Sequence, residues 1–261
     1  MTQTFECTQC GKCCHDLNLP LTVKESVDWI SNGNVVKLLV EAIPWSEGSS
    51  PNDALLSRKK QITFAALSGS LSMRVQVTFL GYFSGACPHL GDLHQCSIYE
   101  HRPLTCRIYP FEMNPHIALN PDNKLCPSEA WGLRNLDTTS NTQHPLQISI
   151  MDKATAAHIQ NIFTQTAQDV AIKERVCACL GIRSSSLSNE GYLFHHVDQA
   201  QLRGLLQTLP TNTKGLANGN ESQDWRIYSP SDTTRSDLSQ IGAYALPTEE
   251  LTEKEEYIHF R

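Results

Sequence analysis

The sequence predicts an α+β protein in which a small, irregular cysteine-cluster domain is organised by metal, with helices from the C-terminal half packed on it. Three observations support this fold class. Eight of the ten cysteines precede residue 127. Short stretches of alternating hydrophobicity, typical of strands, occur among stretches of helical spacing. The C-terminal half, in contrast, carries two amphipathic patterns of helical length.

Composition restricts the class of protein further. The 261 residues are 40% hydrophobic and 18% charged, which is typical of a folded chain of one large or two small domains. A formal net charge of −6 argues against nucleic-acid binding, which requires a basic face. The sequence contains no apolar run of membrane-spanning length and no secretory signal pattern. We therefore expect a cytoplasmic protein with neither nucleic acid nor membrane as a partner.

The first part of the chain predicts a short strand, a helix and further strands. Residues 15–21 partly alternate, and Thr22 with Glu25 forms a capping-box pattern at the start of a helix. Residues 35–43 are apolar and fit a strand or a helix. Residues 46–60 are interpreted as an exposed loop that ends in a basic stretch.

Strand and turn signals then lead into the second group of cysteines. Residues 75–79 alternate with period two and are rich in β-branched side chains, which predicts a strand. Pro103 fits the first turn of a short helix that carries Cys106 one turn later, and Pro110 ends that helix.

The second half of the chain is expected to be helical and then polar. Residues 151–176 predict one long amphipathic helix, and Asp198 begins a second helix that ends at Pro210. Residues 211–235 resemble a loop or disordered segment, and the acidic last dozen residues resemble a solvated tail. The predicted division is a cysteine-cluster domain over 1–135, a helical region over 136–210 and a polar, partly disordered tail over 211–261.

The cysteines point to metal rather than to disulfides. In a reducing compartment, a high cysteine count indicates metal or redox chemistry. Eight thiolates suffice for two four-sulfur sites, and either tetrahedral zinc or a cubane iron–sulfur cluster takes four. The candidate ligands are Cys7, Cys10, Cys13, Cys14, Cys87, Cys96, Cys106 and Cys126.

The spacing leaves the partition of these ligands open. Side chains of adjacent residues diverge, so Cys13 and Cys14 indicate either two neighbouring centres or one centre with spare thiols. Mixed cysteine and histidine ligation is also open. Three cysteines at two-residue spacing favour a [4Fe–4S] cluster slightly over zinc. The histidines in this region are His15, His89, His94 and His101.

Other residues near the cysteines have two interpretations each. Arg102 and Arg107 flank Cys106 and could compensate thiolate charge or pair with Glu100. Tyr99 and Tyr109 are expected to shield the site from water. Farther along the chain, Cys177 and Cys179 form a Cys-x-Cys pair in an apolar segment, which we interpret as part of the core.

Three sequence patterns resemble the YkgJ-type cysteine-cluster family. They are Cys-x2-Cys-Gly-x-Cys-Cys, Cys-Pro-x-Leu and Cys-x-Ile-Tyr-Glu-x-Arg-Pro-x-x-Cys-Arg-x-Tyr-Pro, within residues 5–130. The family is described as a zinc- or iron-chelating domain and is related to a bacterial flagellin lysine N-methylase. The resemblance implies metal binding by the first seven candidate cysteines, together with Cys126, and it does not supply a reaction.

Two alternative functions follow from these patterns. A protein-modifying enzyme related to the methylase is one, although neither a Cys-x3-Cys-x2-Cys pattern nor a glycine-rich cofactor loop is present in the sequence. A metal-delivery or sensing module with labile thiolates is the other. The partner is thus the metal ion or cluster, and a protein partner could bind through the C-terminal half.

Overall fold

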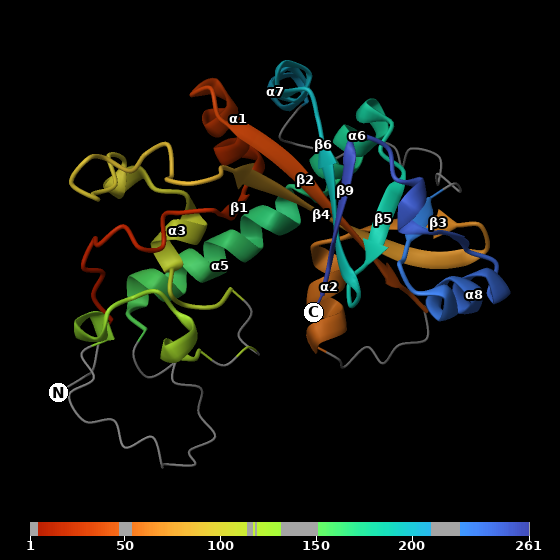
Figure 1. Ribbon diagram of the computed structural model, residues 1–261, viewed down its shortest axis with the longest axis horizontal. Coiled ribbons are helices and arrows are strands. Elements are labelled where there is room, and N and C mark those ends of the chain that lie inside the picture. Colours follow the sequence, from red (N-terminus) through yellow and green to blue (C-terminus); the bar gives the residue numbers. More distant parts are fainter. Residues whose placement is uncertain are drawn as a thin grey trace, which may run out of the picture. The chain divides into compact units, whose positions relative to one another are not determined.

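The chain forms two compact units, each built from two separate segments. The computed structural model describes residues 5–46, 54–113, 117, 119–131, 151–209 and 225–260 (Figure 1). The first unit, here called the cysteine unit, comprises Met1–Leu21 and Tyr82–Thr164. The second, here called the sheet unit, comprises Thr22–Gly81 and Gln165–Arg261. The protein is α+β, as predicted, and its cysteine-rich domain is small.

A mixed sheet forms the sheet unit. Adjacent strands follow the order β4, β2, β5, β7, β8. The last four of these are parallel to one another. Strand β3 forms a hairpin with β4, and β6 joins β9 to β2 by antiparallel pairing. The bounds are β2 Val35–Pro44, β3 Phe64–Ser68, β4 Leu71–Tyr82, β5 Ser184–Leu187, β6 Gly191–His196, β7 Arg226–Tyr228, β8 Tyr244–Leu246 and β9 Glu255–His259.

Strand β2 lies at the centre of this sheet and pairs with two strands along the same side. Its first half pairs with β6, with Lys37 opposite His196, and its second half pairs with β5, with Glu41 opposite Ser186. Strands buried on both faces carry near-continuous apolar runs, so the strand interpretation of residues 35–43 is the one that the structure adopts.

The buried side chains of β5 are mostly polar, and the sequence did not predict this strand. All four residues of Ser184–Leu187 are buried. A buried hydroxyl is tolerated only when it is hydrogen-bonded. The Ser186 hydroxyl donates to the Val40 carbonyl at 3.4 Å and accepts from the Leu193 amide at 3.2 Å, and it thereby connects β5 to β2 and β6.

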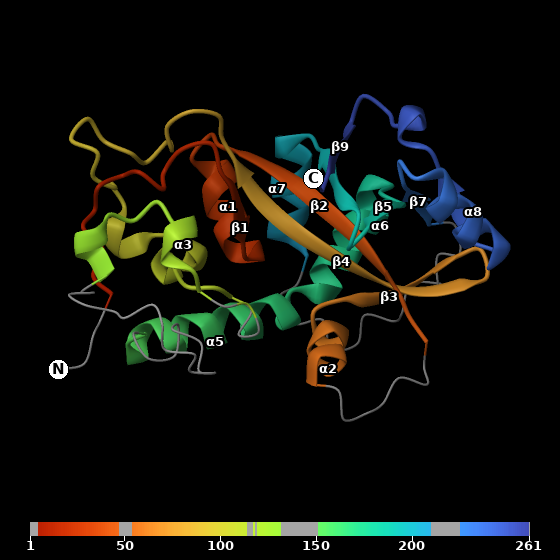
Figure 2. The same ribbon diagram turned by 60° about the horizontal axis from the view of Figure 1, so that its bottom comes forward.

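The helix starts in the sheet unit follow the predicted capping patterns. In α1 (Val23–Ser31), the Thr22 hydroxyl accepts from the Glu25 amide at 3.2 Å, and the Glu25 carboxylate accepts from the Thr22 amide at 2.9 Å. Helix α7 (Gln199–Thr208) begins after Asp198, which accepts from the Gln201 amide at 2.7 Å. Helix α7 packs against α1 and against α6 (Val170–Leu180) (Figure 2).

Two helical predictions differ from the structure. The single helix predicted over 151–176 is divided into α5 (Lys153–Gln168) and α6 (Val170–Leu180). The break falls at Asp169, whose carboxylate accepts a hydrogen bond from the Val23 amide at 2.8 Å and so caps α1. Residues Ala54–Gln61, interpreted as loop, form helix α2, and its last turn carries the basic stretch.

The end of the chain also differs from the predicted polar tail. Residues 226–259 contain β7, β8, β9 and helix α8 (Asp232–Gln240). Trp225 and Ile227 anchor this segment, since they are 2% and 0% exposed. The predicted domain boundaries at residues 135 and 210 lie outside the described residues, as do residues 211–224.

The cysteine unit consists mostly of loops around short elements (Figure 1). These include β1 (Asn18–Leu21), α3 (Leu104–Ile108) and the first turns of α5. Its hydrophobic cluster is small and consists of Phe111, Leu119, Ala130 and Trp131, with Phe5, Cys126, Met151 and Ile159 packed against it. Across the described ranges of both units, no helix has the length and apolar character needed to cross a bilayer.

Candidate metal centre

The first cysteine arm, residues 7–14, is a tight loop that depends on Gly11. Gln9 and Gly11 have φ of 54° and 69°, and the Cys14 amide donates to the Gly11 carbonyl at 2.9 Å. A β-carbon on Gly11 would lie 2.8 Å from the His94 carbonyl oxygen. Glycine is therefore required twice here, for the left-handed backbone and for the close approach of residues 90–94. Sequence reasoning did not single out this residue.

Backbone pairing joins the first arm to the segment that carries Cys87. The Cys87 amide donates to the Cys14 carbonyl at 2.9 Å, and His15 forms an isolated antiparallel bridge with Ala86. Asp16 completes the junction, because its carboxylate accepts from the Gly85 amide at 2.6 Å. Cys14 and Cys87 are consequently close neighbours although 72 residues separate them in the sequence.

A short hairpin then places Cys96 beside Cys87. The Leu90 amide donates to the Cys87 carbonyl at 2.9 Å, and Leu90 forms an antiparallel bridge with Cys96. The Ser97 amide donates to the His89 carbonyl at 2.8 Å and closes the hairpin. Cys14, Cys87 and Cys96 thus lie on three adjoining stretches of backbone.

The two arginines next to Cys106 hold the backbone of this region. Arg102 donates to the Tyr99 carbonyl at 2.8 Å, and its guanidinium carbon lies 3.6 Å from the centre of the Tyr99 ring. Arg107 donates to the carbonyls of Arg102 at 2.7 Å and Glu100 at 3.0 Å. The Glu100 partner of Arg107 is therefore its carbonyl rather than its carboxylate. Helix α3, which carries Cys106, is fixed in turn by the Thr105 hydroxyl, a donor to the Pro20 carbonyl at 2.8 Å.

Cys126 lies beside the start of the first arm. The Trp131 indole donates to the Cys126 carbonyl at 3.4 Å, and the Glu6 amide, next to Cys7, donates to the Ala130 carbonyl at 2.9 Å. The Phe5 ring meets Trp131 edge-on at 5.3 Å between ring centres. These contacts bring the two ends of the cysteine-bearing sequence together.

Burial and mutual charge raise the pKa of several thiols. Burial raises the pKa of Cys106 to about 12, and the charges of Cys14 and Cys87 add to the effect. Burial also raises the pKa of Cys126 to about 11, with further contributions from Cys7 and Cys10. Thiols that are difficult to ionise alone are held as thiolates when a cation binds them, and each then releases a proton.

In the pair Cys13 and Cys14, the pKa values move in opposite directions. Their sulfur atoms lie 4.0 Å apart and share a hydrogen bond. That hydrogen bond lowers the pKa of Cys14, burial opposes the change, and the charges of His15 and Arg102 support it. It also raises the pKa of Cys13, with burial as the next cause. One thiolate is therefore favoured at this pair.

The donors fit a thiophilic metal in number and chemistry, while their shells remain open. Seven of the eight candidate thiols are half-buried and Cys7 is exposed. In the ranges that the structure describes, no three cysteine, histidine or acidic side chains lie close enough together to hold one ion. The four candidate histidines belong to the same ranges and therefore join no such group. Closing a shell requires the loops to draw the sulfurs inward.

Cys177 and Cys179 belong to the sheet unit and not to the cysteine unit. Cys177 is 0% exposed in the core and burial raises its pKa to about 12, whereas Cys179 is exposed. The predicted place in the core is therefore confirmed for Cys177 and wrong for Cys179.

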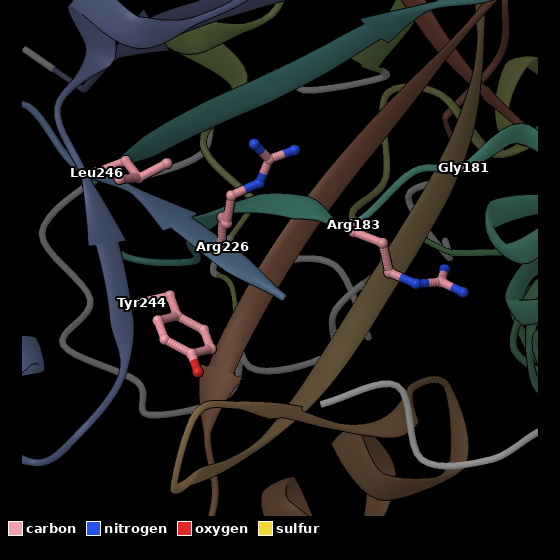
Figure 3. A pocket seen from close by; sticks show the side chains of 5 residues that line it. All are labelled: Gly181, Arg183, Arg226, Tyr244 and Leu246. Atoms are coloured by element: carbon pink, nitrogen blue, oxygen red, sulfur yellow. The ribbon is translucent and has the colours of Figure 1, made fainter. Parts of the chain in front are cut away.

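The sheet unit contains a separate pocket of about 480 Å³, at the amino ends of the parallel strands (Figure 3). Arg226 and Tyr244 begin β7 and β8 and share one register position, and Arg183 precedes β5. The surface that lines the pocket is mostly apolar, and the guanidinium groups of Arg183 and Arg226 point in different directions (Figure 3). The pocket contains no thiol and is independent of the cysteine set.

One comparison with known proteins bears on this geometry. Residues 6–127 match the sequence model of the CxxCxxCC family, described as a "putative zinc- or iron-chelating domain". No curated protein and no solved structure matches the chain. The matched range includes all eight candidate ligands and neither Cys177 nor Cys179.

Proposed function

We propose that the chain binds its metal through eight thiolates of the cysteine unit, since residues 6–127 match the model of a zinc- or iron-chelating domain family. One observation carries the proposal. Three segments distant in sequence are joined by backbone hydrogen bonds that gather these thiols in one unit. The proposed ligands are Cys7, Cys10, Cys13, Cys14, Cys87, Cys96, Cys106 and Cys126.

The hydrophobic cluster of the cysteine unit supports a stabilising role for the metal. A core of four buried residues supplies little of the free energy needed to order so many loop residues. Small domains of this kind commonly gain the remainder from metal ligation. We therefore propose that bound metal stabilises this unit, and that a redox role is added if the metal is iron.

We favour a [4Fe–4S] cluster over zinc, on the spacing of Cys7, Cys10 and Cys13. All thiols of this set are free, which suits a reducing compartment, and we place the protein in the cytoplasm. When bound, a cluster supplies one-electron chemistry and zinc supplies only structure or Lewis acidity. In either case the cysteines of this chain act as sulfur donors.

The identity of the metal is tested on protein purified without oxygen. We expect brown protein with iron and acid-labile sulfide in equal amounts, and colourless protein with stoichiometric zinc would overturn the preference for iron. Cys106→Ser should lose metal, whereas Cys179→Ser, an exposed cysteine of the sheet unit, should retain it. Wild-type protein without either metal would contradict the proposed function itself.

Metal delivery or sensing is a second candidate, favoured by the partial exposure of the thiols. Half-buried thiols remain accessible to a competing ligand, which suits an exchangeable metal. Rapid loss of metal to a mild chelator without loss of structure would support this function. A structural site should instead unfold the cysteine unit when it is stripped. Catalysis, and a protein partner for the C-terminal half, stay predictions.

A further inference from the structure

We propose that the eight cysteines divide into two four-thiolate centres, with Cys13 in one and Cys14 in the other. The inference rests on the proposed function and assigns the ligands within it. The first quartet is Cys7, Cys10, Cys13 and Cys126. The second quartet is Cys14, Cys87, Cys96 and Cys106.

Backbone geometry defines the second quartet. The amide of Cys87 donates to the carbonyl of Cys14, and the hairpin that follows places Cys96 next to the turn after Cys87. These three cysteines therefore lie on adjoining stretches of backbone. Cys106 joins them from helix α3, which is tied to β1 immediately after this junction.

Backbone geometry also defines the first quartet. The chain enters the first arm beside residue 130, where the Glu6 amide meets the Ala130 carbonyl, and Trp131 in turn holds the Cys126 carbonyl. Cys7 therefore lies next to the segment that carries Cys126. The Tyr109 hydroxyl accepts from the Leu125 amide at 3.0 Å and positions the same segment from the other side.

The electrostatic neighbours of most thiols divide in the same way, and Cys13 lies at the border between the two groups. The charges of Cys7 and Cys10 act on Cys126, and those of Cys14, Cys126 and Cys106 act on Cys13. The charges of Cys126, Cys13 and Cys10, which are three members of the first quartet, act on the Tyr109 hydroxyl.

In the second quartet, the charges of Cys14 and Cys96 act on Cys87, and the charges of Cys14, Cys87 and Cys96 act on Cys106. Interactions at this range require proximity, so the two lists of neighbours outline two groups of sulfur atoms.

The vicinal pair requires a separate argument. In a tetrahedral site with metal–sulfur bonds of about 2.3 Å, sulfur atoms lie about 3.8 Å apart. The 4.0 Å between Cys13 and Cys14 would therefore also allow them to share one ion. Their backbone partners favour separate centres. The Cys14 carbonyl accepts from the Cys87 amide, whereas the arm that carries Cys13 begins at Cys7, beside the segment of Cys126.

Contacts between the quartets show that the two proposed centres adjoin. Tyr99, three residues after Cys96, has a hydrogen bond with Cys7, and Cys13 also feels the charge of Cys106. Each quartet has its own neighbouring cation. Arg102 lies near Cys14 and Cys106, and Lys124 lies near Cys126. Each cation offsets part of the negative charge of four thiolates, and Lys124 also pairs with Glu112 at 2.6 Å.

The test measures metal content and sulfur coordination in the full-length chain. Wild-type protein should hold two centres, so two zinc ions or eight irons, each with four sulfur ligands by X-ray absorption. Cys126→Ser and Cys13→Ser should each lose one centre, and the double variant should lose no more. Cys106→Ser and Cys14→Ser should each lose the other centre. Cys126→Ser with Cys14→Ser should lose both, and Cys179→Ser should lose neither.

Footprinting of the wild-type protein avoids variants that fail to fold. The chain is loaded stepwise with zinc, its free thiols are alkylated, and protection is read by mass spectrometry. Protection should appear in two sets of four that match the quartets. Protection of Cys13 together with Cys14, or a single centre lost in every variant, would overturn the partition. Protein that binds no metal would instead overturn the proposed function.

Discussion

The contact between Gly11 and the hairpin of residues 90–94 makes Gly11→Ala the most informative single substitution. The substitution places a β-carbon on a backbone with φ of +69°, which costs about 1–2 kcal/mol. That carbon would lie 2.8 Å from the His94 carbonyl oxygen and 3.1 Å from a Leu90 methyl group. Displacing such neighbours typically costs about 1–3 kcal/mol more. We therefore expect a destabilisation of about 2–5 kcal/mol.

Gly85→Ala is the matched control. Gly85 lies in the same unit and has φ of +75°, but a β-carbon there would meet nothing within 4 Å. It should lose only the backbone contribution of about 1–2 kcal/mol. The difference between the two variants therefore isolates the steric contact with His94.

Hydrogen exchange read by mass spectrometry measures this effect locally, in metal-free protein. Peptides that cover residues 11–17 and 85–97 should exchange faster in Gly11→Ala than in Gly85→Ala, while peptides of α7 remain unchanged. A local method is needed because two units need not unfold in one transition. Equal exchange in the two variants would refute the close approach of the first arm to the hairpin.

Three further predictions concern the core, the metal and pH. Trp131→Ala should destabilise the cysteine unit by about 3–5 kcal/mol in chemical denaturation, whereas Leu93→Ala, at 81% exposure, should change little. Removal of bound metal by a strong chelator should abolish protection from exchange in residues 7–14, and unchanged protection would contradict a structural metal. Acid should release β9. Burial lowers the pKa of His195, so the neutral imidazole stabilises the fold above about pH 6.5, and this stabilisation is lost as pH falls through the pKa of the folded state. Burial would raise the pKa values of Glu255 and Glu256, but hydrogen bonds outweigh it and lower both values. Glu255 accepts from Ser184 and Thr252, and Glu256 accepts from Lys37. The stability that these two carboxylates contribute therefore persists to lower pH than that of His195. Hydrogen exchange in residues 255–259, corrected for intrinsic rates, should accelerate as pH falls. In Lys37→Met, the part of this acceleration that occurs at the lowest pH should be weaker. Acceleration with rising pH would contradict this account.

Local signals in the sequence predicted what local interactions determine. The capping box at Thr22 and the helix start at Asp198 are satisfied within three residues, and the structure confirms both. Asp169 breaks the predicted long helix, in contrast, because its carboxylate is used by α1, 146 residues away in the sequence. No window of local sequence contains that partner.

The C-terminal strands were missed for a related reason. The serines of β5 look like a loop because their burial depends on hydroxyl partners in β2 and β6. Glu255 and Glu256 look like a solvated tail until Ser184, His195, Lys37 and His196 are placed beside them. Polar residues with distant partners do not show the hydrophobic periodicity on which strand prediction depends.

The candidate metal centre was predictable in composition but not in arrangement. The eight thiols follow from residue type and count alone. The division of Cys13 from Cys14 depends on the pairing of residues 14–16 with 85–87, which only the folded chain displays.

The two-segment construction of the cysteine unit has a consequence during synthesis. Cys7–Cys14 leaves the ribosome before the 60 residues of Thr22–Gly81, which belong to the sheet unit, and before every other proposed ligand. At roughly 5–20 residues per second, the first arm waits about 4 s for Cys87 at the fastest and about 24 s for Cys126 at the slowest. During that interval four thiols within eight residues are exposed without the partners that would complete their shells. Nascent chains are therefore most vulnerable to oxidation, and most open to a metal donor, before the second segment has been translated.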